Sequence, residues 1–167
     1  MPASTGVGGQ NLEGVAIVGG VWAVQAMNRT ATVQVVPSPL QCSSLEYGSA
    51  FSRAMLVKTP FCQRLLISGT ASIGPDGRSL YVADLNRQIE LSMKVVREIL
   101  ASCGFDFTHI TRATAYFKNI QDIPAFDLWR KNHVLEPFPL IATQSTMCRG
   151  ELLFEIEMDA ILIKGAN

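Results

Sequence analysis

Charged residues are scarce in this 167-residue sequence: they make up 17% of the chain, whereas hydrophobic residues make up 48%. A soluble monomer usually carries more charge on its surface, so the composition favours an oligomer that buries part of that surface. The formal net charge is zero, and the chain has no polybasic tract. We therefore expect no nucleic-acid partner and no binding to a membrane surface.

Signals for metal binding and for secretion are also lacking. The chain has two histidines, and its four cysteines (Cys42, Cys62, Cys103 and Cys148) include no CxxC pair, so neither a zinc site nor another cofactor is expected. Scattered free thiols are typical of a reducing compartment. The apolar run 15–27 contains two glycines, is too short to span a bilayer and follows no basic region. These features predict a cytoplasmic protein without a membrane segment.

The first 45 residues differ in character from the rest of the chain. Two apolar runs, 15–27 and 31–36, are joined by a short polar segment and predict a β-hairpin. A Pro-Ser-Pro sequence ends this unit, and a loop is expected after it. We therefore expect an N-terminal appendage over residues 1–45 and one main domain over residues 46–167.

The main domain has a pattern that predicts the order β-β-α-β-α-β-β. Helices are expected at 84–103 and 122–134, because apolar residues recur there every three to four positions behind an aspartate that can cap the helix. Two amphipathic helices are most simply placed on one face of a mixed sheet, which defines an α+β fold. Strands are expected at 51–57, at 64–73, at 110–117, and on both sides of the turn Arg149-Gly150 within residues 141–163.

The last strand alternates strictly between apolar and acidic residues. Residues 152, 154, 156, 158, 160 and 162 are apolar, whereas Glu155, Glu157 and Asp159 have the other parity. Successive side chains of a strand point to opposite faces, so one face is apolar and the other carries three carboxylates. This acidic face follows the pair Cys148-Arg149, and any chemistry of the chain is expected there.

Several segments resemble the RidA (YjgF) superfamily: LLISGTASIGPDG (65–77), the helix from about Gln88, HITRATAYFKNIQD (109–122) and LLFEIEMDA (152–160). Three more look like the C-terminal half of the chorismatases, a branch that hydrolyses the enolpyruvyl ether of chorismate: FSRAMLV (51–57), SGTASI (68–73) and QSTMCRGELLFEIE (144–157). The resemblance implies a chorismate-mutase-like fold and a barrel-like homotrimer with sites in the clefts between subunits.

The resemblance also implies a reaction class, the hydrolysis of a carboxylate-bearing enol ether or of an enamine or imine. Both reactions need a proton on a vinyl carbon before water attacks. Glu155 matches the glutamate of the family's Glu-Ile-Glu pattern and is the expected catalytic proton donor. Glu157 and Asp159 are expected to raise its pKa by repulsion between like charges. Alternatively, the three acids form a solvated face or ion pairs between subunits.

The carboxylate of the substrate needs a cation, and here the sequence departs from the RidA deaminases. These carry an arginine directly after a Phe-Pro pair, whereas Phe138-Pro139 is followed by Leu140. Arg53 and Arg149 are candidates to replace it, because a guanidinium binds a carboxylate through two parallel hydrogen bonds. Further expected substrate contacts are Ser68, Gly69, Thr70, Tyr116, Gln144 and Cys148.

Two interpretations remain open at Gly69 and for the protein as a whole. A glycine inside a strand marks either a β-bulge alone or the close approach of a ligand or another backbone. The whole chain is interpreted either as a hydrolase or as a non-catalytic homotrimer that binds a metabolite. The missing arginine favours the second function.

Overall fold

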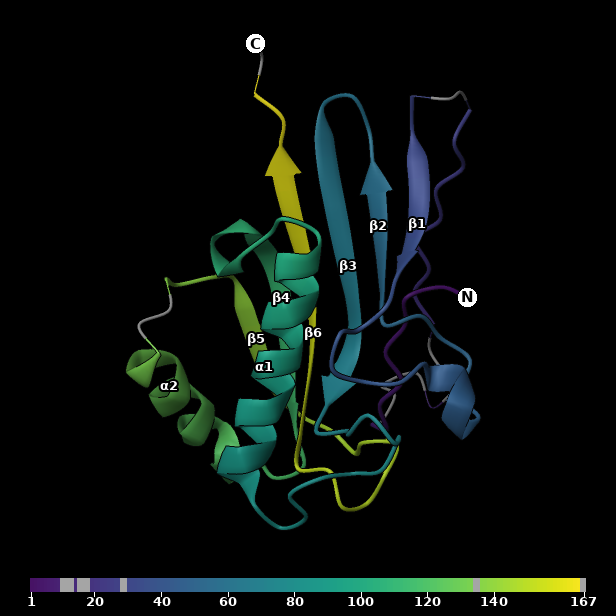
Figure 1. The fold of residues 1–167 in the computed structure, drawn as a ribbon. Helices are drawn as coiled ribbons and strands as arrows, with labels where there is room; N and C mark the ends of the chain where they lie inside the picture. The colour runs from purple at the N-terminus through teal and green to yellow at the C-terminus, as the bar shows by residue number, and fades with distance from the viewer. Residues whose placement is uncertain (10–13, 15–18, 28–29, 134–135, 166–167) are drawn as a thin grey trace.

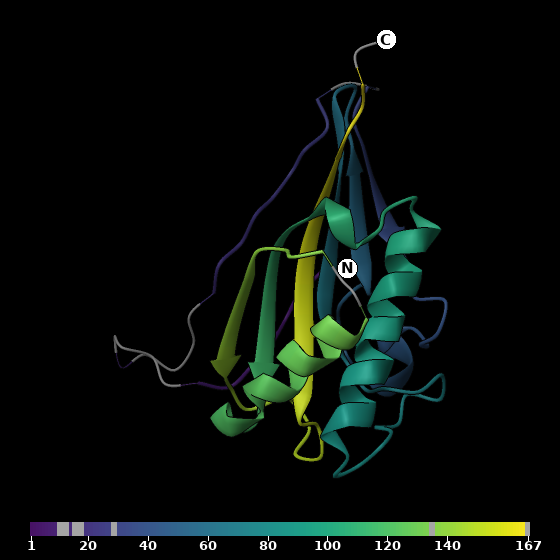
Figure 2. The same ribbon diagram turned by 90° about the vertical axis from the view of Figure 1, so that its left-hand side faces the viewer.

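The computed structural model describes residues 1–9, 14, 19–27, 30–133 and 136–165. They form a mixed six-stranded sheet in the order β1-β2-β3-β6-β4-β5, and the two α-helices cover one of its faces (Figure 1). Turned by 90°, the molecule shows the helices on one side of the sheet and the N-terminal chain on the other (Figure 2). The predicted α+β architecture is confirmed.

The strands are β1 (Thr32–Val36), β2 (Ala54–Lys58), β3 (Cys62–Ala71), β4 (Ile110–Phe117), β5 (Leu140–Gln144) and β6 (Phe154–Ile163). Neighbouring strands pair antiparallel, except that β4 and β5 are parallel. Three short 3-10 helices, η1 (Ser44–Tyr47), η2 (Phe107–His109) and η3 (Ile120–Asp122), connect these elements. The long strand β6 lies between β3 and β4 and so forms the centre of the sheet.

Both predicted helices are present, as α1 (Leu85–Ser102) and α2 (Ile123–Asn132). The side chain of Asp84 caps α1 by accepting a hydrogen bond from the Arg87 N–H at 3.0 Å. Gly104, with φ of +77°, follows the end of α1 in the left-handed conformation that glycine tolerates best. Local sequence signals therefore define both ends of this helix.

The core lies between the helices and the apolar face of β6. Phe154, Ile156 and Met158 are fully buried there, as the alternation of the strand predicts. The Phe154 ring lies 5.2 Å from the Phe117 ring and 5.1 Å from the Phe126 ring, measured between ring centroids. This aromatic cluster packs α2 against the sheet. The acidic residues of β6, which have the opposite parity, therefore lie on the face away from the helices.

The predicted N-terminal hairpin is wrong. Residues 19–27 form no strand, and residues 15–18 lie outside the described part of the chain. β1 pairs instead with β2, from Thr32 opposite Lys58 to Val36 opposite Ala54, and therefore extends the main sheet.

Residues 1–9, called the N-terminal strap below, lie across the sheet face opposite the helices. Ala3 forms a parallel bridge with Ser52, and Gly8 forms an antiparallel bridge with Thr146. The strap thus connects the start of β2 with the chain that follows β5. It covers the face on which the carboxylates of β6 were expected.

Candidate functional site

Gly69 sits at an irregularity of β3, where the register against β6 shifts between Ile67 and Thr70. A Cβ atom at Gly69 would lie 2.0 Å from Glu155 Oε1 and 2.8 Å from the Cγ2 atom of Thr5. The irregularity of the strand is present, and the close approach that requires glycine is made by two side chains of the same chain, one from β6 and one from the strap.

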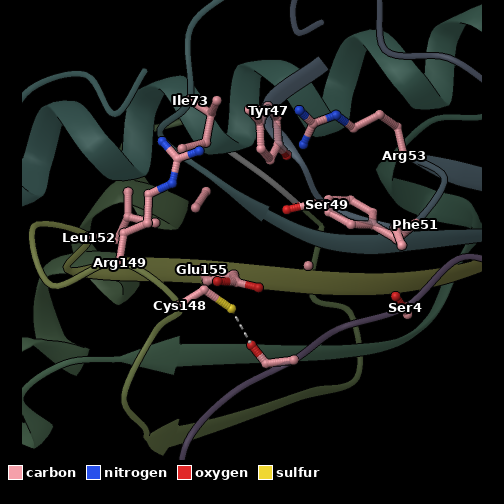
Figure 3. A pocket seen from close by; sticks show the side chains of 14 residues that line it. Ser4, Tyr47, Ser49, Phe51, Arg53, Ile73, Cys148, Arg149, Leu152 and Glu155 are labelled. Atoms are coloured by element: carbon pink, nitrogen blue, oxygen red, sulfur yellow. Dashed lines mark hydrogen bonds between the residues drawn. The ribbon is translucent and has the colours of Figure 1, made fainter. Parts of the chain in front are cut away.

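A cavity of about 300 Å³ opens beside this bulge on the face opposite the helices (Figure 3). Five of the predicted site residues line it together: Arg53, Gly69, Cys148, Arg149 and Glu155. They come from the start of β2, from β3, from the turn before β6 and from β6 itself. Segments that are distant in sequence thus meet at one hollow, whose size is at the lower end of the range of small-molecule sites.

Glu155 is the second residue of β6, and only 7% of its surface is exposed. Its pKa is raised from 4.5 to about 7, mainly because burial disfavours the charged carboxylate and also because Glu157 carries a negative charge nearby. The expected contribution of Asp159 to this shift is not found. Glu155 is thus a buried carboxyl group that exchanges its proton near neutral pH.

The other two acids of β6 are neutralised within the chain. Arg112 Nη1 lies 2.8 Å from Glu157 Oε1, and its Nη2 lies 3.4 Å from Asp159 Oδ1. Arg64 Nη2 lies 2.8 Å from Asp159 Oδ2. These two acids therefore form ion pairs within one chain, and not the solvated face that was one alternative; pairs between subunits stay a prediction. Within the described part of the chain, Glu155 has no such partner.

The two candidate arginines lie on either side of the ring of Tyr47 (Figure 3). Arg53 is buried, and its Nε and Nη2 atoms donate to the Cys42 carbonyl at 3.1 and 3.0 Å. Arg149 Nη1 donates to the Gly77 carbonyl at 2.8 Å. Both guanidinium groups are thus held by backbone carbonyls beside the cavity.

Tyr47 was not predicted as a site residue. It ends η1, and Gly48 follows it with φ of +81°. Ser43 and Glu46 form a capping box at the start of this short helix. The Ser-x-x-Glu spacing is visible in the sequence and signals an ordered turn within residues expected to be a loop. Burial raises the pKa of the Tyr47 hydroxyl, although the nearby Arg53 opposes the shift.

Four predicted contact residues do not line this cavity in the single chain: Ser68, Thr70, Tyr116 and Gln144. The Ser68 hydroxyl donates to the Ser52 carbonyl, and the Thr70 hydroxyl donates to the Ser68 carbonyl at 2.9 Å. Gln144 Nε2 donates to the Lys118 carbonyl at 3.2 Å. These hydrogen bonds shape the backbone around the bulge and at the end of β5.

Tyr116 lies opposite Glu155 in the pairing of β4 with β6. Its pKa is raised to about 12, mainly by burial and further by the negative charge of Glu157. It packs against a small apolar cluster that includes Met147 and Leu152. The Tyr116 hydroxyl therefore keeps its proton throughout the neutral range, and its ring supports the wall behind the cavity.

Cys148 is exposed at the cavity, and its thiol donates to the Gly6 carbonyl at 3.1 Å (Figure 3).

None of the described residues forms a group of three or more His, Cys, Asp or Glu that could hold a metal ion. Neither helix α1 nor any other helix in the described part of the chain is long and apolar enough to cross a membrane.

Comparison with known proteins identifies the family that has this fold. The chain belongs to the family described as Endoribonuclease L-PSP, the RidA/YjgF family, whose model matches residues 45–162. A human 2-iminobutanoate/2-iminopropanoate deaminase is 26% identical over 117 residues, which are 69% of this chain and 80% of that protein. The predicted family resemblance is confirmed.

Solved structures show the same fold at lower identity. Yeast Mmf1 has a TM-score of 0.64 and 16% identity, and the match covers 78% of this chain and 98% of that one. A chorismatase has a TM-score of 0.62 and 18% identity, with 77% of this chain covered. The match covers 44% of that chorismatase, so this chain corresponds to less than half of it.

Proposed function

We propose that this chain is a small-molecule hydrolase that acts on a carboxylate-bearing enol ether or on an enamine or imine, with Glu155 as the proton donor. One observation carries the proposal. A buried carboxyl group with a pKa of about 7 lies on the wall of a cavity that two guanidinium groups also line. A proton donor is most effective when its pKa is close to the working pH, because the group is then substantially protonated and still acidic.

The chemistry needs one proton transfer and one addition of water. With an enol ether of pyruvate, the Glu155 carboxyl protonates the terminal vinyl carbon, and the double-bond electrons form the new C–H bond. Water adds to the resulting oxocarbenium ion, and the hemiketal breaks down to pyruvate and an alcohol. An enamine follows the same course through an iminium ion, with ammonia as the leaving group. The Glu155 carboxylate recovers its proton from the attacking water.

Arg53 and Arg149 are the proposed binding groups for the substrate carboxylate. A guanidinium has five N–H donors, and each of these arginines uses only some of them on backbone carbonyls. The Gly69 N–H and the Cys148 thiol also lie at the cavity and are proposed to orient the ligand. In this proposal the two arginines take the role of the arginine that Leu140 replaces.

We also propose a cytoplasmic homotrimer in which neighbouring copies complete the cleft. Several large apolar side chains support association because they are mostly exposed in the single chain, among them Phe61 at 79%, Ile141 at 65% and Ile163 at 77%. In such an assembly Ser68, Thr70, Tyr116 and Gln144 are proposed as secondary contacts to the substrate. Native mass spectrometry measures the number of copies, and a monomeric mass contradicts this part of the proposal.

The reaction is tested by measuring release of pyruvate from chorismate and of ammonia from 2-aminoacrylate. We expect one of these substrates to be turned over and the Glu155→Gln variant to be slower by about 100-fold or more, because an amide cannot donate a proton to carbon. The matched control is Glu136→Gln, which changes an exposed glutamate in the loop after α2. A folded protein that turns over neither substrate contradicts the proposed hydrolysis.

A non-catalytic metabolite-binding protein is the second candidate function. It is favoured by Leu140, which stands where the deaminases of the family carry an arginine. This alternative predicts that a carboxylate ligand raises the melting temperature of wild-type protein and of Glu155→Gln equally, without turnover. A ligand effect that disappears in Glu155→Gln contradicts it.

A further inference from the structure

The N-terminal strap uses the same polar atoms that a ligand in the cavity would use. The Gly69 N–H, which faces the cavity at the bulge of β3, donates to Thr5 Oγ1 at 2.8 Å. The Cys148 thiol donates to the Gly6 carbonyl at 3.1 Å. Two of the proposed ligand-orienting donors are therefore already paired with the chain's own backbone and side chains.

Two anchors fasten the strap on opposite sides of these contacts. On one side, the Ser52 N–H donates to the Pro2 carbonyl at 2.7 Å. On the other side, the Gly8 N–H donates to the Thr146 carbonyl at 2.7 Å, and the Thr146 N–H donates to the Gly8 carbonyl at 2.9 Å. Between these two short stretches of β pairing the strap forms part of the cavity wall, to which Ser4 and Gly6 contribute.

The strap is held by hydrogen bonds and buries little apolar surface. Of residues 1–9, only Ala3 and Thr5 are partly buried, and the other seven are exposed. Segments with few buried apolar contacts and with exposed backbone hydrogen bonds open locally at low free energy. The strap can therefore leave the cavity while the sheet and its core stay intact.

Glu155 and Thr5 of the strap lie close to the same point at Gly69. Glu155 Oε1 and Thr5 Cγ2 both crowd the point where Gly69 lacks a Cβ atom, at 2.0 and 2.8 Å from it. The strap therefore helps to shield this carboxyl group from water. When the strap is in place, the methyl group of Thr5 lies near the proposed proton donor, while the Thr5 hydroxyl oxygen accepts from the Gly69 N–H.

We propose that the N-terminal strap is an autoinhibitory segment that blocks the two ligand-orienting donors beside Glu155, the Gly69 N–H and the Cys148 thiol. A carboxylate ligand must displace Thr5 and Gly6 before it reaches the Gly69 N–H and the Cys148 thiol. The nature of the ligand rests on the proposed function, whereas the pairing of the strap with these two donors does not. Because only molecules with an open strap bind, the apparent affinity of the site is reduced by the fraction that is open.

A reversible disulfide tests this proposal in the 167-residue chain. A Cβ atom at Gly6 lies 4.0 Å from the Cys148 Sγ atom, so Gly6→Cys places a second thiol within reach of a disulfide after a small adjustment. Oxidised glutathione takes up the two electrons and two protons of the thiols, and dithiothreitol restores them. Gly6→Ser is the matched control, because it adds a side chain of similar size that cannot be cross-linked.

The probe is pyruvate, the product that both proposed reactions can yield, and binding is followed by the shift of the Gly69 amide in ¹H–¹⁵N NMR spectra. We expect oxidised Gly6→Cys to bind pyruvate at least about tenfold more weakly than the reduced form, and Gly6→Ser to be insensitive to the oxidant. Equal affinity of the oxidised and reduced forms overturns the proposal.

Loosened straps provide the opposite perturbation. Thr5→Val removes the oxygen that accepts from the Gly69 N–H, and Gly8→Pro removes the N–H that donates to the Thr146 carbonyl. Each variant is expected to bind pyruvate several-fold more tightly, because the closed state loses a hydrogen bond. Unchanged affinity, or no binding even with a loosened strap, overturns the proposal. Strap-dependent binding of pyruvate without turnover of either substrate refutes the hydrolase and leaves the autoinhibitory strap in place.

Discussion

The raised pKa of Glu155 predicts a specific pH dependence of stability. The pKa rises from 4.5 to about 7 on folding. Each pKa unit corresponds to roughly 1.4 kcal/mol, so the complete effect is about 3 kcal/mol. Between these two pH values the folded protein holds a proton that the unfolded chain has released. Stability is therefore lost as the pH rises through this window, and the loss is complete above about pH 7.

The variant Glu155→Gln removes this ionisation. The free energy of unfolding of Glu155→Gln minus that of wild type is expected to be larger by about 3 kcal/mol at about pH 8 than at about pH 4.5, because only wild type loses stability over this range. Urea unfolding at both pH values, at one protein concentration, measures the difference, and Glu136→Gln controls for the change in net charge. If the difference in unfolding free energy between Glu155→Gln and wild type is the same at both pH values, then the inferred pKa is wrong.

Two further substitutions test the packing around the site by urea unfolding. Gly69→Ala places a Cβ atom 2.0 Å from a carboxyl oxygen and is expected to lower the free energy of unfolding by about 1–3 kcal/mol. Gly150→Ala is the control, because there is open space around Gly150 and little change is expected. Equal effects of the two substitutions contradict this reasoning. Asp159→Asn leaves two arginines without their shared carboxylate, and because both arginines are partly exposed the loss is expected to be about 2 kcal/mol. An Asp159→Asn variant as stable as wild type shows that these ion pairs contribute nothing.

Elements with strong local signals were predicted well from the sequence. Helix α1 has a capping aspartate, an apolar stripe and a terminal glycine, and all three signals act within a few residues of the boundary that they define. Strand β4 runs from Ile110 to Phe117, as its alternation indicates. The strand partner of residues 31–36 was not predictable in this way, because alternation indicates a strand without selecting the edge to which it pairs.

Residues of the candidate site could be predicted from the sequence only where they lie in segments that resemble the family. Glu155 and Gly69 follow from their positions in segments that resemble the family. Tyr47 does not, because its place between Arg53 and Arg149 depends on contacts between segments about 100 residues apart in sequence. The N-terminal strap is held in place by hydrogen bonds and has no hydrophobic pattern. The sequence therefore gives no sign that the strap lines the cavity.

The pH dependence of kcat/KM for the substrate that is turned over tests most directly whether Glu155 is the proton donor. This ratio reports the pKa of the essential acid in the free enzyme. Because the carboxyl must be protonated to act, kcat/KM is expected to fall about tenfold per pH unit above about pH 7. A profile that stays flat to about pH 9 in wild type, or that is retained in Glu155→Gln, contradicts the assignment.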